Sequence, residues 1–280
     1  MSEDVVELPK IAILGAGSMG RAILSGLLKP GVHADGIVVT NRSGERAASL
    51  AGTPGVTAIA TDDDPDANRT AVRGAGVVLV AVKPAMVPDL LAEIAETIEP
   101  DAIVVSVAAG VTVARFEELL SASVAVVRSM PNTPAIVGKA VTGVSAGTRS
   151  TPEQVALVRR LFETVGSVVE VPESQLDALS TISGSGPAYV FFLIEQLTAT
   201  AVSKGFTPEQ AADLVNGTFI GATRLLEVSD ETPMQLRLQV TSPKGTTEQA
   251  VAVLQDADLE SVFDRATDAA LARARELAAG

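Results

Sequence analysis

Three glycines early in the chain have the spacing of a dinucleotide-binding loop. Gly15, Gly17 and Gly20 form G-x-G-x-x-G directly after the apolar run "IAIL" and at the start of a helical pattern. In such a loop the first glycine allows a tight turn, the second lets the backbone approach a pyrophosphate, and the third permits close packing of helix on strand. The free amides at the helix N-terminus favour the phosphates. We expect cofactor contacts from the whole loop: Gly15, Ala16, Gly17, Ser18, Met19 and Gly20.

The end of the second expected strand indicates which dinucleotide is bound. A chain that binds NAD usually has Asp or Glu there, which accepts a hydrogen bond from the ribose 2′-hydroxyl. This chain has "TNRS", residues 40–43, and no carboxylate. Arg42 can pair with a 2′-phosphate and Asn41 can donate to it. The alternative is a solvated arginine in a polar turn. The pattern favours NADP (NADPH) over NAD.

The composition excludes several other kinds of site. With 34 acidic and 21 basic residues the net charge is −13, so no nucleic-acid partner is expected. The chain has no cysteine, which leaves no thiol nucleophile. Its one histidine, His33, lies in a Gly/Pro-rich turn, which argues against a Ser-His-Asp triad, and no metal site is expected. The longest charge-free stretch, residues 178–194, contains "SGSGP" in its middle, and we expect no membrane span. The acidic beginning "MSEDVVELPK" has no apolar signal core, and a cytoplasmic protein is expected.

The elements that must position these residues fall into two expected domains. Residues 1–172 alternate short apolar runs with helical patterns: "IAILG", "GIVVTN", "VTAIA", "GVVLVAV", "AIVVSVA", "VAVVRSM" and "SVVEVP". Apolar strands of this kind are buried on both faces, which predicts an α/β domain with a parallel-rich sheet. Thr151-Pro152 and Gly166 mark the start and stop of its last long helix.

Residues 173–280 read as helices joined by short turns, without a convincing strand. Thr207-Pro208 and Thr232-Pro233 repeat the start signal of a capping residue followed by proline. The stretch "AYVFFLIEQL" is apolar nearly all round, which is unusual for a helix with one face in water. This helical domain is therefore expected to be buried in a subunit interface as well as in its own core.

Further stretches follow one another in an order typical of a known family. They are "GAGSMG", "AVKP" (81–84), "SVAAG" (106–110), "MPNTPAIVG" (130–138), "SGSGPAY" (183–189) and "TSPKGTT" (241–247). Each alone is a weak signal, and the ordered set resembles pyrroline-5-carboxylate reductase over almost the whole chain. The resemblance implies a Rossmann-like N-terminal domain and an all-α C-terminal dimerisation domain. It also implies the last step of proline biosynthesis: NADPH reduces 1-pyrroline-5-carboxylate, a cyclic imine carboxylate. Homodimers with interleaved helical domains are implied as well, with a decamer or other larger ring as the expected higher assembly.

The resemblance also implies roles for individual residues. Asn41 and Arg42 would lie near the adenosine ribose and its phosphate, and Asn68 matches a cofactor-contacting asparagine of some members. The segment of Ala81, Val82, Lys83 and Pro84 would lie beside the cofactor, and Ala108, Ala109 and Gly110 would lie near its nicotinamide. Ser242 and the amides of Gly245 and Thr246 would surround the substrate carboxylate. Thr247 would hydrogen-bond the ring nitrogen, and is the one catalytic residue expected; the alternative is that it only caps a helix.

Lys244 departs from the family pattern, which usually has a small residue there. If this position needs a positive φ, lysine is strained, because only glycine adopts that conformation freely. We expect an outward Lys244 side chain with no loss of activity.

Reduction of the imine is expected to need positioning of substrate and cofactor rather than a strong general acid. An imine protonated from water already accepts hydride.

Two other functions fit parts of the pattern. One is a related reductase, acting on another cyclic imine or on a β-hydroxy acid; the second type generally uses a lysine on the central helix, whereas Lys204 lies at the far end beside Gly205. The other is a non-catalytic NADP-binding regulator, which leaves the hydroxyl-rich 241–247 loop unexplained.

Overall fold

The computed structural model describes the backbone of residues 5–279, and side chains as far as residue 276. The chain divides into two compact units. The first comprises Met1–Ser185 together with Leu271–Gly280, and the second is Gly186–Ala270.

The first unit is built on a sheet of eight strands in the order β10-β9-β8-β7-β6-β2-β4-β5. The neighbours from β5 to β8 are all parallel, β9 is antiparallel to β8, and β10 is parallel to β9. A separate parallel pair joins β1 to β3. The strands are β1 (Val6–Leu8), β2 (Ile11–Leu14), β3 (Val32–Ala34), β4 (Ile37–Asn41), β5 (Val56–Ala60), β6 (Val77–Val80), β7 (Ile103–Ser106), β8 (Ala125–Met130), β9 (Ala140–Ala146) and β10 (Gly166–Glu170).

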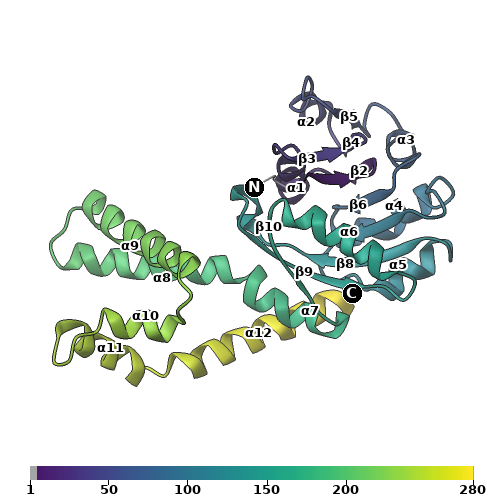
Figure 1. The fold of residues 1–280 in the computed structure, drawn as a ribbon. Coiled ribbons are helices and arrows are strands. Elements are labelled where there is room, and N and C mark those ends of the chain that lie inside the picture. Colours follow the sequence, from purple (N-terminus) through teal and green to yellow (C-terminus); the bar gives the residue numbers. More distant parts are fainter. Residues whose placement is uncertain (1–4, 280) are drawn as a thin grey trace. The chain divides into compact units, whose positions relative to one another are not determined.

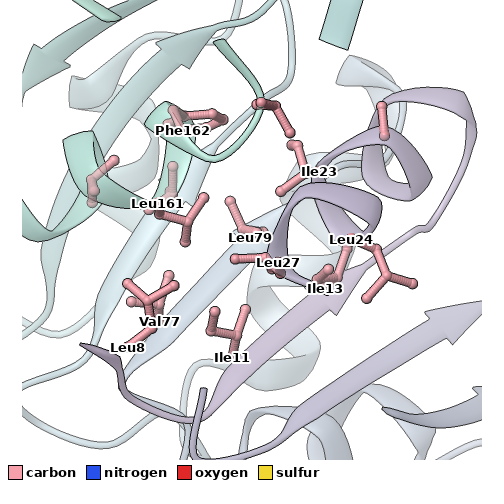
Figure 2. Close-up of a cluster of buried hydrophobic side chains, with 14 of the residues drawn as sticks. Leu8, Ile11, Ile13, Ile23, Leu24, Leu27, Val77, Leu79, Leu161 and Phe162 are labelled. Atoms are coloured by element: carbon pink, nitrogen blue, oxygen red, sulfur yellow. The ribbon is translucent and has the colours of Figure 1, made fainter. Parts of the chain in front are cut away.

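Helices cover both faces of this sheet, so each face has its own apolar core (Figure 1). On one face Ile23 and Leu27 of α1 and Phe162 of α6 pack over Ile13 and Leu79 of the central strands (Figure 2). The other face is covered by α3, α4 and α5. The helices of this unit are α1 (Ser18–Leu27), α2 (Gly44–Ala48), α3 (Ala67–Val72), α4 (Val87–Ile94), α5 (Val113–Leu119), α6 (Pro152–Glu163) and α7 (Glu173–Leu179).

The predicted helix starts are confirmed in atomic detail. Thr151, Thr207 and Thr232 each cap a helix, and in each case the glutamine three residues later closes a capping box. The helix after Thr151 ends at Glu163, and Gly166 begins strand β10. Gly166 is required there because a side-chain Cβ would lie 2.1 Å from the carbonyl oxygen of Ala140 on the neighbouring strand.

The second unit is entirely helical, as predicted. Its helices are α8 (Gly186–Ser203), α9 (Pro208–Val228), α10 (Pro233–Gln239), α11 (Thr246–Asp256) and the first part of α12 (Leu259–Ala279), and α8 packs against α9 (Figure 1). Among its described apolar side chains only Ala211 and Val215 are buried. Phe191 of α8 is 67% exposed in the single chain.

The predicted fold class is confirmed, and the apolar runs named above form β2, β4, β5, β6, β7, β8 and β10. The sequence did not predict β1, β3 or β9. Strand β9 was missed because Thr142, Gly143 and Ser145 interrupt its apolar pattern, whereas its burial depends on lying between β8 and β10. Among the described residues, no helix is both long and apolar enough to cross a membrane.

Candidate active site

The glycine loop adopts the conformation that its sequence predicts. Gly15 follows β2 with φ of 85°, and a Cβ there would lie 2.6 Å from Cγ1 of Val82. Gly17 is the N-cap of α1, and a Cβ there would meet nothing within 4 Å. A Cβ on Gly20 would lie 3.3 Å from the Gly15 carbonyl oxygen, so the helix packs closely on the loop. The loop is thus fixed by close contacts at Gly15 and Gly20 and open at Gly17, where a ligand can approach.

A cleft of about 1130 Å³ opens beside this loop. It lies at the carboxyl ends of β2, β4 and β6, where the strand order reverses between β2 and β6. Open α/β sheets bind ligands at this switch point. The predicted cofactor residues in its wall are Gly15, Gly17, Asn41, Arg42, Asn68, Ala81, Val82 and Lys83.

Asn41 provides the best test of whether a dinucleotide fits this cleft. The residue is 3% exposed, and its side-chain nitrogen Nδ2 is buried without a hydrogen-bond partner among the described residues. A buried donor of this kind is costly unless something accepts from it. Because Asn41 also lines the cleft, a bound phosphate or ribose oxygen would satisfy it. The residues present therefore fit a dinucleotide.

Arg42 projects from the same turn and is free to meet an anion. Its side chain is 84% exposed, and its Nε atom lies 3.8 Å from Oδ1 of Asp62. The amides of Thr61 and Asp62 donate to the carbonyl oxygens of Asn41 and Arg42, at 2.8 and 3.0 Å. These bonds continue the β4–β5 pairing past the strand ends and keep Asp62 beside Arg42. The arginine therefore has only a weak, solvated partner in the described chain.

Asn68 and Lys83 lie on other walls of the cleft. The side-chain amide of Asn68 donates to Oε2 of Glu93 at 3.1 Å. Lys83 is exposed and directly precedes the 3₁₀ turn Pro84–Met86. Two elements place these residues at the cleft, since Asn68 lies in the first turn of α3 and Lys83 follows the end of β6.

Other predicted cofactor residues do not line the cleft wall. Ala16 and Ala108 are buried, and the Ala108 amide lies 3.3 Å from the Ser106 hydroxyl. Gly110 has φ of 77°, which a side chain would disfavour. Contacts from these positions stay predictions, as they do for the others outside the wall: Ser18, Met19, Gly20, Pro84 and Ala109.

Several residues of the wall were not predicted from the sequence. Thr61 and Asp62 follow β5, and their signal is the register that pairs β5 with β4. Arg46 and Glu45 come from the short helix α2 beside Arg42. The rim near Arg42 thus holds two arginines and two carboxylates.

Two family motifs outside the cleft contact each other in the first unit. The Asn132 side chain donates to the Ser183 carbonyl at 2.9 Å and accepts from the Val141 amide at 2.9 Å. Ser183 belongs to the π-helical turn Ser180–Gly184, directly before α8. "RSMPNTPAIVG" and "SGSGPAY" are thereby joined, which fixes the chain where it leaves the first unit.

A buried arginine, Arg128, holds α7 in place next to these two motifs. The Arg128 side chain is 7% exposed and bonds Glu173 at 3.2 Å and Asp177 at 2.8 Å, both on α7. Glu173 also accepts from the Val113 amide at 2.7 Å. These bonds hold α7 on the sheet at β8.

The predicted substrate loop is a tight turn before α11 in the second unit. Gly245 is the N-cap of α11, and its amide donates to the Ser242 carbonyl at 2.9 Å. Binding of a carboxylate by the Gly245 amide would therefore require this bond to be shared or broken. Thr246 and Thr247 begin the helix, so their amides have no acceptor within it. The turn offers an anion these amides and the hydroxyls of Ser242 and Thr247.

Lys244 has φ of 59° and so lies in the left-handed region. The sequence predicted strain if this position needed a positive φ, and the structure has that conformation. The Lys244 amide donates to Oε2 of Glu248 at 2.8 Å.

Comparison with known proteins matches both parts of the chain. Residues 173–277 match the family described as pyrroline-5-carboxylate reductase dimerisation, and residues 10–110 match NADP oxidoreductase, coenzyme F420-dependent. Pyrroline-5-carboxylate reductase of Mycobacterium tuberculosis is 40% identical, covering 96% of this chain and 97% of its own. The enzyme of Corynebacterium melassecola is 39% identical, covering 95% and 98%.

Solved structures give the same picture. A pyrroline-5-carboxylate reductase from Coxiella burnetii has a TM-score of 0.88 at 37% identity, covering 95% of this chain and 97% of its own. The enzyme of Plasmodium falciparum, solved with NADP bound, shares the fold with a TM-score of 0.79 at 24% identity, covering 96% and 98%. With both domains matched in order and near-complete coverage by relatives above 30% identity, this chain belongs to the pyrroline-5-carboxylate reductase family.

Proposed function

We propose that this protein reduces 1-pyrroline-5-carboxylate to L-proline with NADPH, the last step of proline biosynthesis. The observation that carries the proposal is that the cleft and the Ser242–Thr247 turn belong to one chain that matches reductases of this substrate over more than nine-tenths of its length. The cofactor supplies hydride when bound.

The cleft of the first unit would bind the cofactor. Gly15 and Gly17, with the first turn of α1, would hold the pyrophosphate, since that turn has no acidic residue and no side-chain cap. The buried Asn41 amide and the exposed Arg42 would bind the 2′-phosphate. Lys83 would lie along the cofactor, and its charge would favour the anionic molecule.

The Ser242–Thr247 turn would hold the substrate. The amides of Thr246 and Thr247 lie at the positive end of α11, which favours a carboxylate. The Ser242 hydroxyl would add a donor, and the Thr247 hydroxyl would bond the ring nitrogen. Orientation of this kind can lower a barrier by several kcal/mol without a strong general acid.

Assembly and location complete the proposal. The helical unit would form a homodimer with a second copy, with a decamer or another larger ring as the higher assembly. The exposed apolar side chains of α8, among them Phe191, Phe192 and Leu197, support this. The protein would act in the cytoplasm, and fractionation of cells that express it would test that location.

The test is NADPH oxidation by purified protein on adding 1-pyrroline-5-carboxylate, with proline identified by mass spectrometry. We expect turnover in the wild type. Thr247→Ala should lose about 10- to 100-fold in kcat while the Kd for NADPH stays within about twofold. Tight NADPH binding without proline formation would contradict the proposal, and would point to another imine or to a regulator.

A further inference from the structure

The turn before α11 contains a backbone conformation that its own residue does not favour. Lys244 and Asp258 are the two non-glycine residues with positive φ among those described. Asp can offset this conformation through local hydrogen bonds of its short side chain, whereas a lysine side chain cannot. Lys244 therefore has to be held in the left-handed region by something other than its own preference.

Glu248 provides that restraint. Its Oε2 atom accepts a hydrogen bond from the Lys244 amide at 2.8 Å. Because the acceptor is an ionised carboxylate, this bond is stronger than one between neutral groups. Glu248 lies three residues after the N-cap Gly245, at the first turn of α11, where the helix dipole also favours its charge.

Comparison with the other helices of the chain shows that this arrangement is unusual. At α6, α9 and α10 a threonine caps the helix, and the glutamine three residues later accepts from the amide of that threonine. At α11 the N-cap is a glycine without a side chain, and the glutamate reaches one residue further back, to Lys244. The acidic residue at this position thus fixes the turn before the helix rather than the N-cap itself.

The two hydrogen bonds of the turn determine which donors can meet a ligand. The Lys244 amide is taken by Glu248, and the Gly245 amide is taken by the Ser242 carbonyl. This leaves the Thr246 and Thr247 amides at the helix start and sets where Ser242 stands relative to Thr247. A turn that relaxed out of the left-handed conformation at Lys244 would change the position of Ser242 relative to these donors, because the backbone direction changes at that residue.

We propose that Glu248 is a positioning residue: its bond to the Lys244 amide holds the Ser242–Thr247 turn in the shape that binds the substrate carboxylate. This inference rests on the proposed function, which makes that turn the substrate site. Both residues are exposed, so losing the bond leaves no buried group unpaired. The effect of removing Glu248 therefore falls on substrate binding rather than on folding.

The experiment is a double-mutant cycle between Glu248→Ala and Lys244→Gly in the full-length enzyme. Glu248→Ala should raise the KM for 1-pyrroline-5-carboxylate about 5- to 20-fold, with the KM for NADPH and the Tm nearly unchanged. In the Lys244→Gly background, Glu248→Ala should raise this KM no more than about twofold, because glycine adopts a positive φ without a restraining hydrogen bond. Glu248→Gln keeps an acceptor oxygen and should retain most of the affinity.

Gln249→Ala, an exposed residue next along α11, is the matched control and should leave both KM values unchanged. An equal rise in the KM for 1-pyrroline-5-carboxylate on Glu248→Ala in the wild-type and Lys244→Gly backgrounds would overturn the inference. The effect of Glu248 would then not depend on the conformation of the turn at Lys244. An unchanged KM in Glu248→Ala beside an impaired Thr247→Ala would also overturn it, while leaving the proposed function intact. If Ser242→Ala and Thr247→Ala were both fully active, the turn would not be the substrate site and the inference would be overturned with it. Absence of proline formation by the wild type would instead overturn the proposed function.

Discussion

The two units of this chain bury very different shares of their apolar residues. In the first unit the central strands are closed on both faces, and side chains such as Ile13 and Leu79 have 0% exposure. In the second unit Phe191, Ile220 and Val253 are 67%, 68% and 69% exposed in the single chain. Large exposed apolar patches mark interaction surfaces. The first unit thus completes the core around its sheet, whereas the second leaves large apolar side chains exposed in the single chain and matches a dimerisation family.

This difference corresponds to a division of work. The cofactor cleft lies wholly within the first unit, whose walls are set by the strands of one sheet. The proposed substrate turn lies in the helical unit, whose described apolar residues are largely unburied in the single chain. We therefore expect cofactor binding to survive changes that abolish assembly, and substrate turnover to be lost with them.

The largest effect is expected from a charge in the exposed face of α8. Phe191→Asp would place a carboxylate in an apolar interface, where an unpaired charge is costly. We expect a monomer by size-exclusion chromatography with light scattering, and a loss of about 100-fold or more in turnover. Leu28→Asp, which makes the same kind of change after α1, should leave assembly intact. A Phe191→Asp variant that still assembles would remove this face from the interface.

A smaller effect, on the free energy of unfolding, tests whether a second copy covers the exposed face of α8. Leu79→Ala in β6 should lower the free energy of unfolding by about 2–5 kcal/mol. Leu193 of α8 is 43% exposed in the single chain, so on that basis Leu193→Ala would cost little. If a second copy covers Leu193, the substitution should lower the free energy of unfolding by more than about 1 kcal/mol, and this decrease should depend on protein concentration. Equilibrium unfolding of both variants at two protein concentrations measures these changes. A negligible decrease for Leu193→Ala would contradict the idea that a second copy covers this face of α8.

The smallest expected effect concerns the rim of the cofactor cleft. Asp62 lies 3.8 Å from Arg42 and would repel a 2′-phosphate bound there. Asp62→Asn should therefore tighten NADPH binding about two- to fivefold, because exposed charges interact weakly in water. NADH, which has no 2′-phosphate, should bind as before. Asp35→Asn, at the opposite end of β4, is the matched control, and equal tightening of NADH would contradict this role.

Local patterns in the sequence predicted much of this structure. Strands such as Ile11–Leu14 and Val77–Val80 are continuous apolar runs, and three helices begin with Thr-Pro followed by a glutamine that closes a capping box. The glycine loop and the "TNRS" turn predicted where a dinucleotide fits. The domain boundary at residue 172 stays a prediction beside a structural division at Ser185 and Leu271.

The features that escaped prediction depend on neighbours distant in the chain or on backbone conformation. Strand β9 is buried by β8 and β10 rather than by an apolar pattern of its own. Asp62 reaches Arg42 only because β5 pairs with β4. The bond from the Lys244 amide to Glu248 occurs together with a positive φ at Lys244, which the residue type does not indicate.

The most direct test of the proposed cofactor site is the ratio of kcat/KM for NADPH over NADH with 1-pyrroline-5-carboxylate, in the wild type and in Arg42→Met. We predict a wild-type ratio above about 10 that falls toward about 1 when the arginine is lost, because the 2′-phosphate then lacks its charged partner. A wild-type ratio below one, or a ratio that Arg42→Met leaves unchanged, would contradict the assignment of Asn41 and Arg42 to the phosphate.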